Sequence, residues 1–209
     1  MLGLSALMCW LPAVRASTIE VNPRSAWQAR APTGPCKPHT ISSISIHHTA
    51  TESHDNTHSL KRLRSYQRYH QDSKGWVDLA YHLFVDLDGN VYAGRNHECV
   101  GDTSTNYDPT GHFLIVLEGN FEVQQVSDRA YDSLVDVVTW AIDEFDVKIE
   151  NIQAHRQLAA TACPGKNLFR KIQDDLVNQL AQRQSNERIP SSELLNGKNI
   201  KNRDARQKK

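Results

Sequence analysis

The sequence predicts one α/β domain in which helices flank a central mixed β-sheet. The chain has 209 residues, of which 39% are hydrophobic and 23% charged, so it is long and apolar enough for a single core. Short β-branched runs alternate with segments whose apolar residues recur every three to four positions, which indicates strands interleaved with helices. No internal repeat interrupts this order.

The strands are predicted from apolar, β-branched runs bounded by turn residues. The segment from Asp86 to Asn90 is a turn, so the runs on either side of it should form a hairpin. The fourth run is continuously apolar, which is typical of a strand covered on both faces. The predicted strands are residues 41–49, 77–85, 91–95, 113–117 and a short one around Ile152.

Three helices follow from the periodicity. The first should be capped by Thr57 and run to about His70, and the second should begin after Ser127, whose side chain is suited to capping a strongly amphipathic segment. The third should run from Leu168 to about Gln182, with leucines and isoleucine at a spacing of four. Residues 17–40 are Pro-rich and are expected to be irregular, with Trp27 as a packing anchor.

The ends of the chain have a different composition from its middle. Residues 1–16 contain an apolar run too short to span a bilayer, followed by a signal-peptide-like cleavage pattern before Ser17. This pattern predicts an exported protein, periplasmic or secreted, with a buried first helix as the alternative. The expected domain is then 17–183.

Residues 184–209 have few apolar side chains, with seven Lys or Arg against three acids. We expect a disordered basic tail, either simply solvated or attracted to an anionic envelope surface. Formal net charge for the whole chain is zero, which does not indicate a nucleic-acid partner.

A metal site is predicted from His155 and Cys163, which lie eight residues apart, with Pro164-Gly165 ending their segment in a turn. Two ligands cannot fill a zinc shell, and the third is expected from His47, which ends the first strand. Two histidines, one cysteine and an open position are typical of a catalytic zinc site. A purely structural site would need a fourth ligand near His47, and the sequence offers no candidate.

Cys36 and Cys99 remain after the metal ligand and the leader are set aside. In an oxidising compartment they would be able to form a disulfide, and two separate thiols are the alternative. Both alternatives stay open at this point.

Several segments, taken in order, resemble a known family, the zinc-dependent N-acetylmuramoyl-L-alanine amidases of the amidase-2 type. This family is related to the peptidoglycan recognition proteins and to the phage amidase-type lysozyme. The resemblance covers roughly residues 25–175. The segments are Trp27-Gln28-Ala29-Arg30, Ile46-His47-His48-Thr49-Ala50, Ala80-Tyr81-His82-Leu83-Phe84, Asp88-Gly89-Asn90-Val91-Tyr92-Ala93-Gly94-Arg95, Glu118-Gly119-Asn120-Phe121, and Ala154-His155-Arg156 with Thr161-Ala162-Cys163-Pro164-Gly165.

The resemblance implies a fold like that of the peptidoglycan recognition proteins and Zn²⁺ held by His47, His155 and Cys163. It implies that Tyr81 works beside the metal, and Thr161 occupies a position two before the cysteine that is often Thr in active relatives. The implied reaction is hydrolysis of the amide between N-acetylmuramic acid and L-alanine in peptidoglycan or muropeptides.

The chain also departs from the family's usual pattern. The loop at residues 101–107 lacks the His-rich form of that segment. Asn96-His97 stands where recognition proteins selective for diaminopimelate carry Gly-Trp, so the preferred stem peptide is not implied.

The remaining candidates follow from the chemistry of amide hydrolysis. A tetrahedral oxyanion needs hydrogen-bond donors, which Tyr81 and Thr161 can supply. Glu118 is a candidate acid or base because a carboxylate after an apolar run invites a raised pKa. The alternative for Glu118 is a turn cap.

Two residues are candidates for holding the substrate. Arg95 is a candidate clamp for a substrate carboxylate, with a structural ion pair as the alternative. His48 is kept as a second substrate-binding candidate, although alternation along the strand points it to the other face and favours a structural use. Two rival functions remain: a peptidoglycan-binding module without activity, and a zinc peptidase that cuts within the stem peptide.

Overall fold

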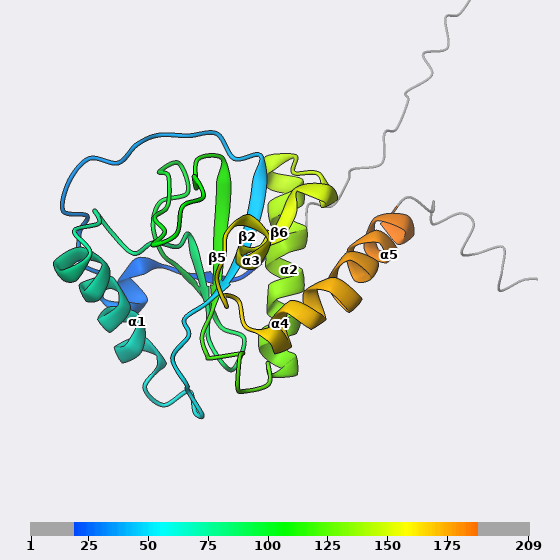
Figure 1. Ribbon diagram of the computed structural model, residues 1–209, viewed down its shortest axis with the longest axis horizontal. Helices are drawn as coiled ribbons and strands as arrows, with labels where there is room; N and C mark the ends of the chain where they lie inside the picture. The colour runs from blue at the N-terminus through cyan, green and yellow to red at the C-terminus, as the bar shows by residue number, and fades with distance from the viewer. Residues whose placement is uncertain (1–18, 188–209) are drawn as a thin grey trace, which may run out of the picture.

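The computed structural model describes residues 19–187, and a six-stranded mixed sheet forms its centre (Figure 1). The strand order is β1-β4-β3-β5-β2-β6. The β3–β4 hairpin is antiparallel, and each of the other neighbouring pairs is parallel. The strands are β1 (Val21–Asn22), β2 (Ser43–His48), β3 (Leu83–Val85), β4 (Val91–Ala93), β5 (His112–Leu117) and β6 (Ile152–Ala154).

Helices cover both faces of this sheet, and in Figure 1 α1 and α2 lie on opposite sides of it. A π-helical turn, η2 (Tyr69–Ser73), prolongs α1, and another, η4 (Ile172–Leu176), joins α4 to α5. The helices are α1 (Ser59–Arg68), α2 (Asp128–Phe145), α3 (His155–Leu158), α4 (Lys166–Lys171) and α5 (Val177–Glu187), with 3₁₀ turns η1 (Arg24–Trp27) and η3 (Ile149–Asn151).

Two hydrophobic clusters form the core, one on each face of the sheet. The larger cluster packs α2 and the C-terminal helices against Ile44 and Ile46 of β2 and the odd-numbered positions of β5. The smaller cluster contains Trp27, Leu63 of α1 and Val116 of β5. Because side chains alternate along a strand, the odd-numbered residues of β2 face the α1 side, opposite to Ile44 and Ile46. Those residues include Ser45 and His47.

The structure confirms the predicted fold class and shortens three of the predicted strands, those at 41–49, 77–85 and 91–95, the second of them most. Only Leu83–Val85 of the predicted strand 77–85 pairs in the sheet. The buried Asp78 carboxylate accepts the N–H of Leu79 at 2.8 Å and the side-chain amide of Gln67 at 2.7 Å. These local side-chain bonds take the place of strand pairing at the start of the segment. The two-residue strand β1 falls in the segment predicted to be irregular.

The helices largely follow the periodicity. Ser127 caps α2 as predicted, because its Oγ accepts the backbone N–H of Ala130 at 3.1 Å. α1 begins at Ser59 with His58 rather than Thr57 at the N-cap position, and α5 continues to Glu187. The predicted leader, and the predicted tail beyond residue 187, lie outside the described residues. Within residues 19–187, no helix is both long and apolar enough to cross a membrane.

Candidate metal centre

Sheet register brings the two histidines of the predicted site together. β2 and β6 are adjacent and parallel, and Ile46 is paired with Ala154. The next residue along each strand is a histidine, so His47 and His155 leave neighbouring strand ends at the same edge of the sheet. Their ring centroids are 4.6 Å apart although 108 positions separate them in the sequence.

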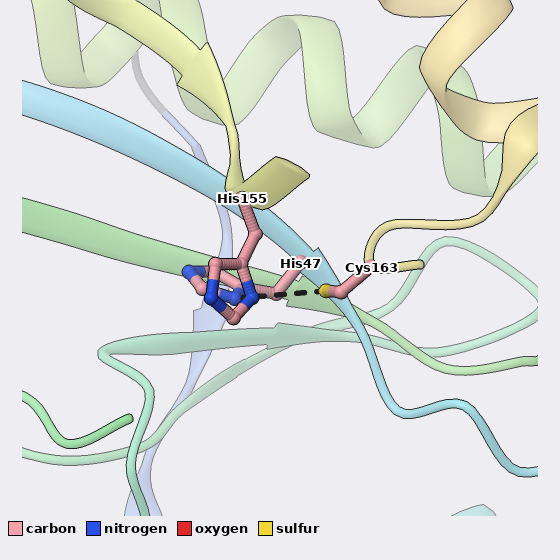
Figure 2. A group of neighbouring side chains, drawn as sticks. All are labelled: His47, His155 and Cys163. Atoms are coloured by element: carbon pink, nitrogen blue, oxygen red, sulfur yellow. Dashed lines mark hydrogen bonds between the residues drawn. The ribbon is translucent and has the colours of Figure 1, made fainter. Parts of the chain in front are cut away.

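The third predicted ligand, Cys163, comes from the loop between α3 and α4 (Figure 2). The backbone N–H of His48 donates to Cys163 Sγ at 3.4 Å, which fixes the sulfur beside the end of β2. Gly165 turns the chain behind it with φ of 87°, and a Cβ there would lie 2.3 Å from the carbonyl carbon of Phe121. Only glycine fits that conformation and approach, which explains the Pro-Gly ending of the motif.

The geometry of the three side chains fits a metal ion. Their ligand atoms all lie within 4.8 Å of one another, and His47 Nδ1 is 3.8 Å from Cys163 Sγ. His155 Nδ1 is buried and has no hydrogen-bond partner. A buried, unpaired nitrogen costs free energy unless something binds it, and an ion beside the thiol would do so. Among the described residues, no fourth His, Cys, Asp or Glu joins this group.

The other nitrogen of each imidazole is already occupied. His155 Nε2 lies 2.8 Å from Thr105 Oγ1, and His47 Nε2 lies 3.1 Å from Ser45 Oγ and 3.4 Å from Tyr107 Oη. Histidines that bind metals commonly donate their second N–H in this way, which fixes the tautomer and the ring orientation. The two Nδ1 atoms are therefore the ones left for an ion.

Without a bound cation, burial sets the protonation states of the three side chains. It holds the pKa of His47 well below its ordinary value and lowers that of His155 to about 4, so both imidazoles are neutral near pH 7. Burial also raises the pKa of the Cys163 thiol to about 12, against a smaller lowering by the N–H of His48. A bound cation would reverse the shift of the thiol, because a metal-binding cysteine loses its proton.

A cavity of about 550 Å³ opens onto the three side chains. Tyr81 lines it, with its ring centroid 5.2 Å from that of His47, and burial raises the pKa of its phenol well above the ordinary range. Thr161 lines it too, and its Oγ1 accepts the N–H of Cys163 at 3.2 Å. His48 also lines it, and its Nδ1 accepts the backbone N–H of Phe121 at 3.2 Å.

Glu118 lies elsewhere. Its carboxylate has no exposed surface, pairs with the Arg62 guanidinium and accepts the Ser59 hydroxyl at 2.6 Å. Both oxygens thus hold the first turn of α1 against the end of β5, and Glu118 is not among the residues that line the cavity. Packing of α1 gives the carboxylate these partners, which favours a structural role for Glu118 over the predicted catalytic acid or base.

Arg95 does not reach the cavity either. Its guanidinium donates to the carbonyl oxygens of Leu79 at 2.7 Å and Val100 at 2.6 Å, and it pairs with Asp102. The side chain is only 4% exposed. No nitrogen of the fork is left for a substrate carboxylate, so the predicted clamp is replaced by the structural ion pair.

Three hydroxyl residues near the imidazoles were not predicted from the sequence: Ser45, Thr105 and Tyr107. Ser45 carried a usable signal, because residues two apart on a strand share a face and His47 is its neighbour by that rule. Thr105 and Tyr107 lie in the irregular loop between β4 and β5, where no periodicity indicates which side chains point inward.

The structure also decides between the two alternatives for Cys36 and Cys99. They form a disulfide with an S–S distance of 2.00 Å, and Cys163 is the free cysteine of the described residues. The bond ties the segment before β2 to the loop after β4.

The chain is similar in sequence to peptidoglycan recognition proteins and to N-acetylmuramoyl-L-alanine amidases. Peptidoglycan-recognition protein SC2 of Drosophila melanogaster is 28% identical over 157 residues, covering 74% of this chain and 85% of the relative. A human N-acetylmuramoyl-L-alanine amidase is 32% identical over 156 residues, or 71% of this chain, which spans only 27% of that longer protein.

Solved structures show the same fold. Drosophila peptidoglycan recognition protein SD superposes with a TM-score of 0.70 at 25% identity, covering 75% of this chain and 95% of that one. Peptidoglycan recognition protein LE, solved with tracheal cytotoxin, a monomeric diaminopimelic acid-type peptidoglycan, has a TM-score of 0.67 at 29% identity, covering 73% and 92%. The family model for N-acetylmuramoyl-L-alanine amidase, Amidase_2, matches residues 37–166. With its fold, its segment order and this match in agreement, the chain belongs to the amidase-2 family.

Proposed function

We propose that this protein is a zinc-dependent amidase that hydrolyses the bond between N-acetylmuramic acid and L-alanine in peptidoglycan or muropeptides. The observation that carries the proposal is the group of His47, His155 and Cys163 at the floor of an open cavity, with His155 Nδ1 buried and unpaired. Two neutral imidazoles and one thiolate are a ligand set typical of catalytic zinc. When bound, Zn²⁺ supplies a Lewis acid that polarises a carbonyl and lowers the pKa of water to ~7.

The residues around the cavity have roles that follow from their protonation. Tyr81 keeps its proton at any physiological pH, because burial raises its pKa. Its hydroxyl is suited to donate to the amide oxygen as negative charge develops there. Thr161 accepts the N–H of Cys163, which leaves its own hydroxyl proton free to donate to the substrate or to the departing amine. His48 is proposed as a substrate contact at the cavity rim.

The relatives support the same class of substrate. One is named as an amidase of this specificity, and another was solved with a monomeric peptidoglycan fragment. Peptidoglycan lies outside the cytoplasm, and the Cys36–Cys99 disulfide is typical of oxidising compartments. We therefore propose export to the periplasm or the medium.

The test is incubation of the purified protein with peptidoglycan sacculi, with and without a chelator, followed by mass spectrometry. An amidase releases peptides that begin at a free L-alanine, and it leaves muramic acid without peptide. His155→Gln should abolish release, and His54→Gln, which removes an exposed imidazole outside the cavity, is the matched control. Release of peptides that begin at a later residue would replace the amidase by a peptidase.

A binding module without activity is the second candidate, because relatives at 28% identity are named as recognition proteins. It predicts that the protein sediments with sacculi and releases nothing, whether or not zinc is added. The presence of all three ligand side chains favours the enzyme.

A further inference from the structure

The loop at residues 96–111, between β4 and β5, contacts both imidazoles of the metal site. Thr105 Oγ1 is 2.8 Å from His155 Nε2, and Tyr107 Oη is 3.4 Å from His47 Nε2. Thr105 is half-buried and lines the cavity. Within residues 19–187, Thr105 is the residue that hydrogen-bonds to His155 Nε2.

Hydrogen bonding within the loop orients the Thr105 hydroxyl. Thr103 Oγ1 accepts the backbone N–H of Thr105 at 3.1 Å and lies 2.8 Å from Thr105 Oγ1. Thr103 Oγ1 can accept the Thr105 hydroxyl proton, and in that arrangement a Thr105 lone pair is available to accept the Nε2–H of His155. That tautomer leaves the lone pair on Nδ1, the buried atom that has no partner in the protein.

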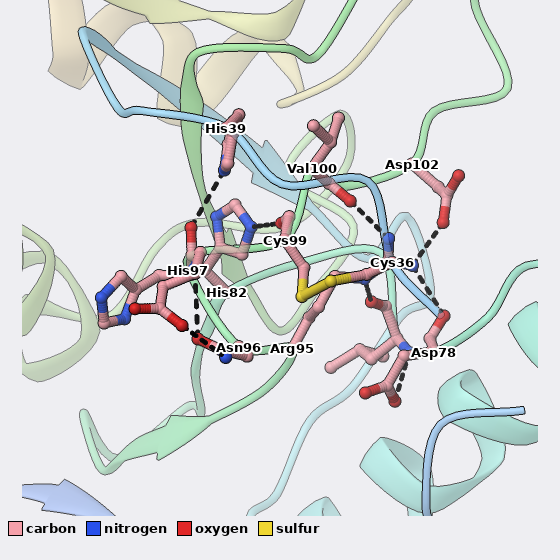
Figure 3. Close-up of a disulfide and its surroundings, with 12 residues drawn as sticks. Cys36, His39, Asp78, His82, Arg95, Asn96, His97, Cys99, Val100 and Asp102 are labelled. Carbon is pink, nitrogen blue, oxygen red and sulfur yellow. Dashed lines mark hydrogen bonds and ion pairs between the residues drawn. A yellow bond between two sulfur atoms is a disulfide. The ribbon is translucent and has the colours of Figure 1, made fainter. Parts of the chain in front are cut away.

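The segment before β2 anchors the loop at both ends, and Figure 3 shows the anchors at its start. The Cys36–Cys99 disulfide joins them covalently, and the Val100 N–H donates to the Lys37 carbonyl at 2.8 Å. The imidazole of His39 bridges the loop: its Nε2 donates to the carbonyl of His97 at 2.9 Å, and its Nδ1 accepts the N–H of Gly111 at 2.9 Å.

Arg95 adds a third anchor from the strand side. Its guanidinium binds the Val100 carbonyl at 2.6 Å and pairs with Asp102, both within the loop. The disulfide, His39 and Arg95 thus hold residues 97–102 and 111, and Thr105 lies between them. A loop fixed in this way places a hydroxyl with the accuracy that a ligand imidazole needs.

We propose that this anchored loop positions the metal ligands, with Thr105 as the positioning residue for His155 and the Cys36–Cys99 disulfide as an anchor on which that contact depends. The inference rests on the proposed function, because it assumes that the three side chains bind zinc. It extends that function by giving the loop a role: the loop departs from the His-rich form of the family, and here it holds the metal ligands in position.

The experiment measures Zn²⁺ affinity by competition with a chromophoric chelator, in the full chain without substrate. Thr105→Val keeps the shape of the side chain and removes the hydroxyl, whereas Thr105→Ser keeps the hydroxyl. We expect Thr105→Val to weaken zinc binding about 10- to 100-fold, the range for loss of such a supporting contact, and Thr105→Ser to stay within about threefold of wild type.

A double-mutant cycle tests the anchor. Cys36→Ala/Cys99→Ala should weaken zinc binding at least about fivefold, and adding Thr105→Val to it should cost less than Thr105→Val costs alone. An undiminished Thr105→Val effect in the background without the disulfide would refute the anchoring role. If that background does not fold, judged by circular dichroism in chelator, the Thr105→Val and Thr105→Ser pair decides.

The outcomes separate this inference from the proposed function. Wild-type protein that binds no zinc would remove both. Thr105→Val with wild-type zinc affinity would overturn the positioning role and leave the amidase proposal standing.

Discussion

The buried imidazole of His82 should make the fold sensitive to acid. Its Nε2–H donates to the Cys99 carbonyl at 2.9 Å, and its Nδ1 accepts the N–H of Leu114 at 2.9 Å. The ring also stacks on Phe113 with centroids 5.3 Å apart. A carbonyl can only accept and an N–H can only donate, so both contacts require the neutral Nε2–H tautomer. Protonation of Nδ1 would set two N–H groups against each other.

The size of the effect follows from the pKa. The pKa of His82 is lowered to about 3, chiefly by burial; the hydrogen bond to the Cys99 carbonyl raises it, and the nearby charges of His39, Arg95 and His97 add a smaller lowering. The unfolded value is about 6.5. Because the pKa of His82 is lower in the folded state, its contribution to the free energy of unfolding is fully present above pH 6.5. That contribution is lost as the pH falls, because the unfolded chain takes up the proton first. Between pH 7.5 and pH 5 the loss from this one group is about 2 kcal/mol.

The assay is urea unfolding at pH 7.5 and pH 5, in chelator and with the disulfide intact. His82→Gln is expected to lose about 2 kcal/mol less over this pH interval than the wild type does, whatever its stability at pH 7.5. His54→Gln, which removes an exposed imidazole, is the matched control for composition. Equal losses in wild type and His82→Gln would refute the reasoning, since they would mean that His82 is as easily protonated in the fold as outside it.

Three further predictions concern the site and its supports. Tyr81→Phe should lower kcat about 10²- to 10³-fold and leave zinc affinity within about threefold, because it removes a donor to the oxyanion; an unchanged kcat on sacculi would contradict this. Glu118→Gln should cost about 1–3 kcal/mol in urea unfolding, since it leaves Arg62, whose side chain is 22% exposed, without its carboxylate partner. The kcat per folded molecule should stay within about twofold. A loss of turnover without a loss of stability would return Glu118 to the reaction. Ser127→Ala should cost ~1 kcal/mol because it removes the cap of α2, and a thermal unfolding midpoint equal to that of the wild type would rule the cap out as a contributor.

Residues of the site differ in how far the sequence could identify them. His47 and Cys163 could be predicted because each sits in a short segment whose residue types suit a metal ligand, at a strand end or before Pro-Gly. Glu118 and Arg95 looked equally suitable by residue type. Their partners, Arg62 and Asp102, are contributed by other segments, and only packing shows that these charges are already paired.

Periodicity in the sequence determined the strands and helices that carry the site, and the order of its segments determined the family. These are local properties, because the alternation of side chains and the capping of a helix depend on residues a few positions apart. The tertiary structure alone decided that Cys36 pairs with Cys99, that Thr105 meets His155, and that Glu118 pairs with Arg62. Each of these contacts joins residues at least 50 positions apart in the sequence. Sheet register and the packing of helices on the sheet set such long-range pairings, and residues a few positions apart do not.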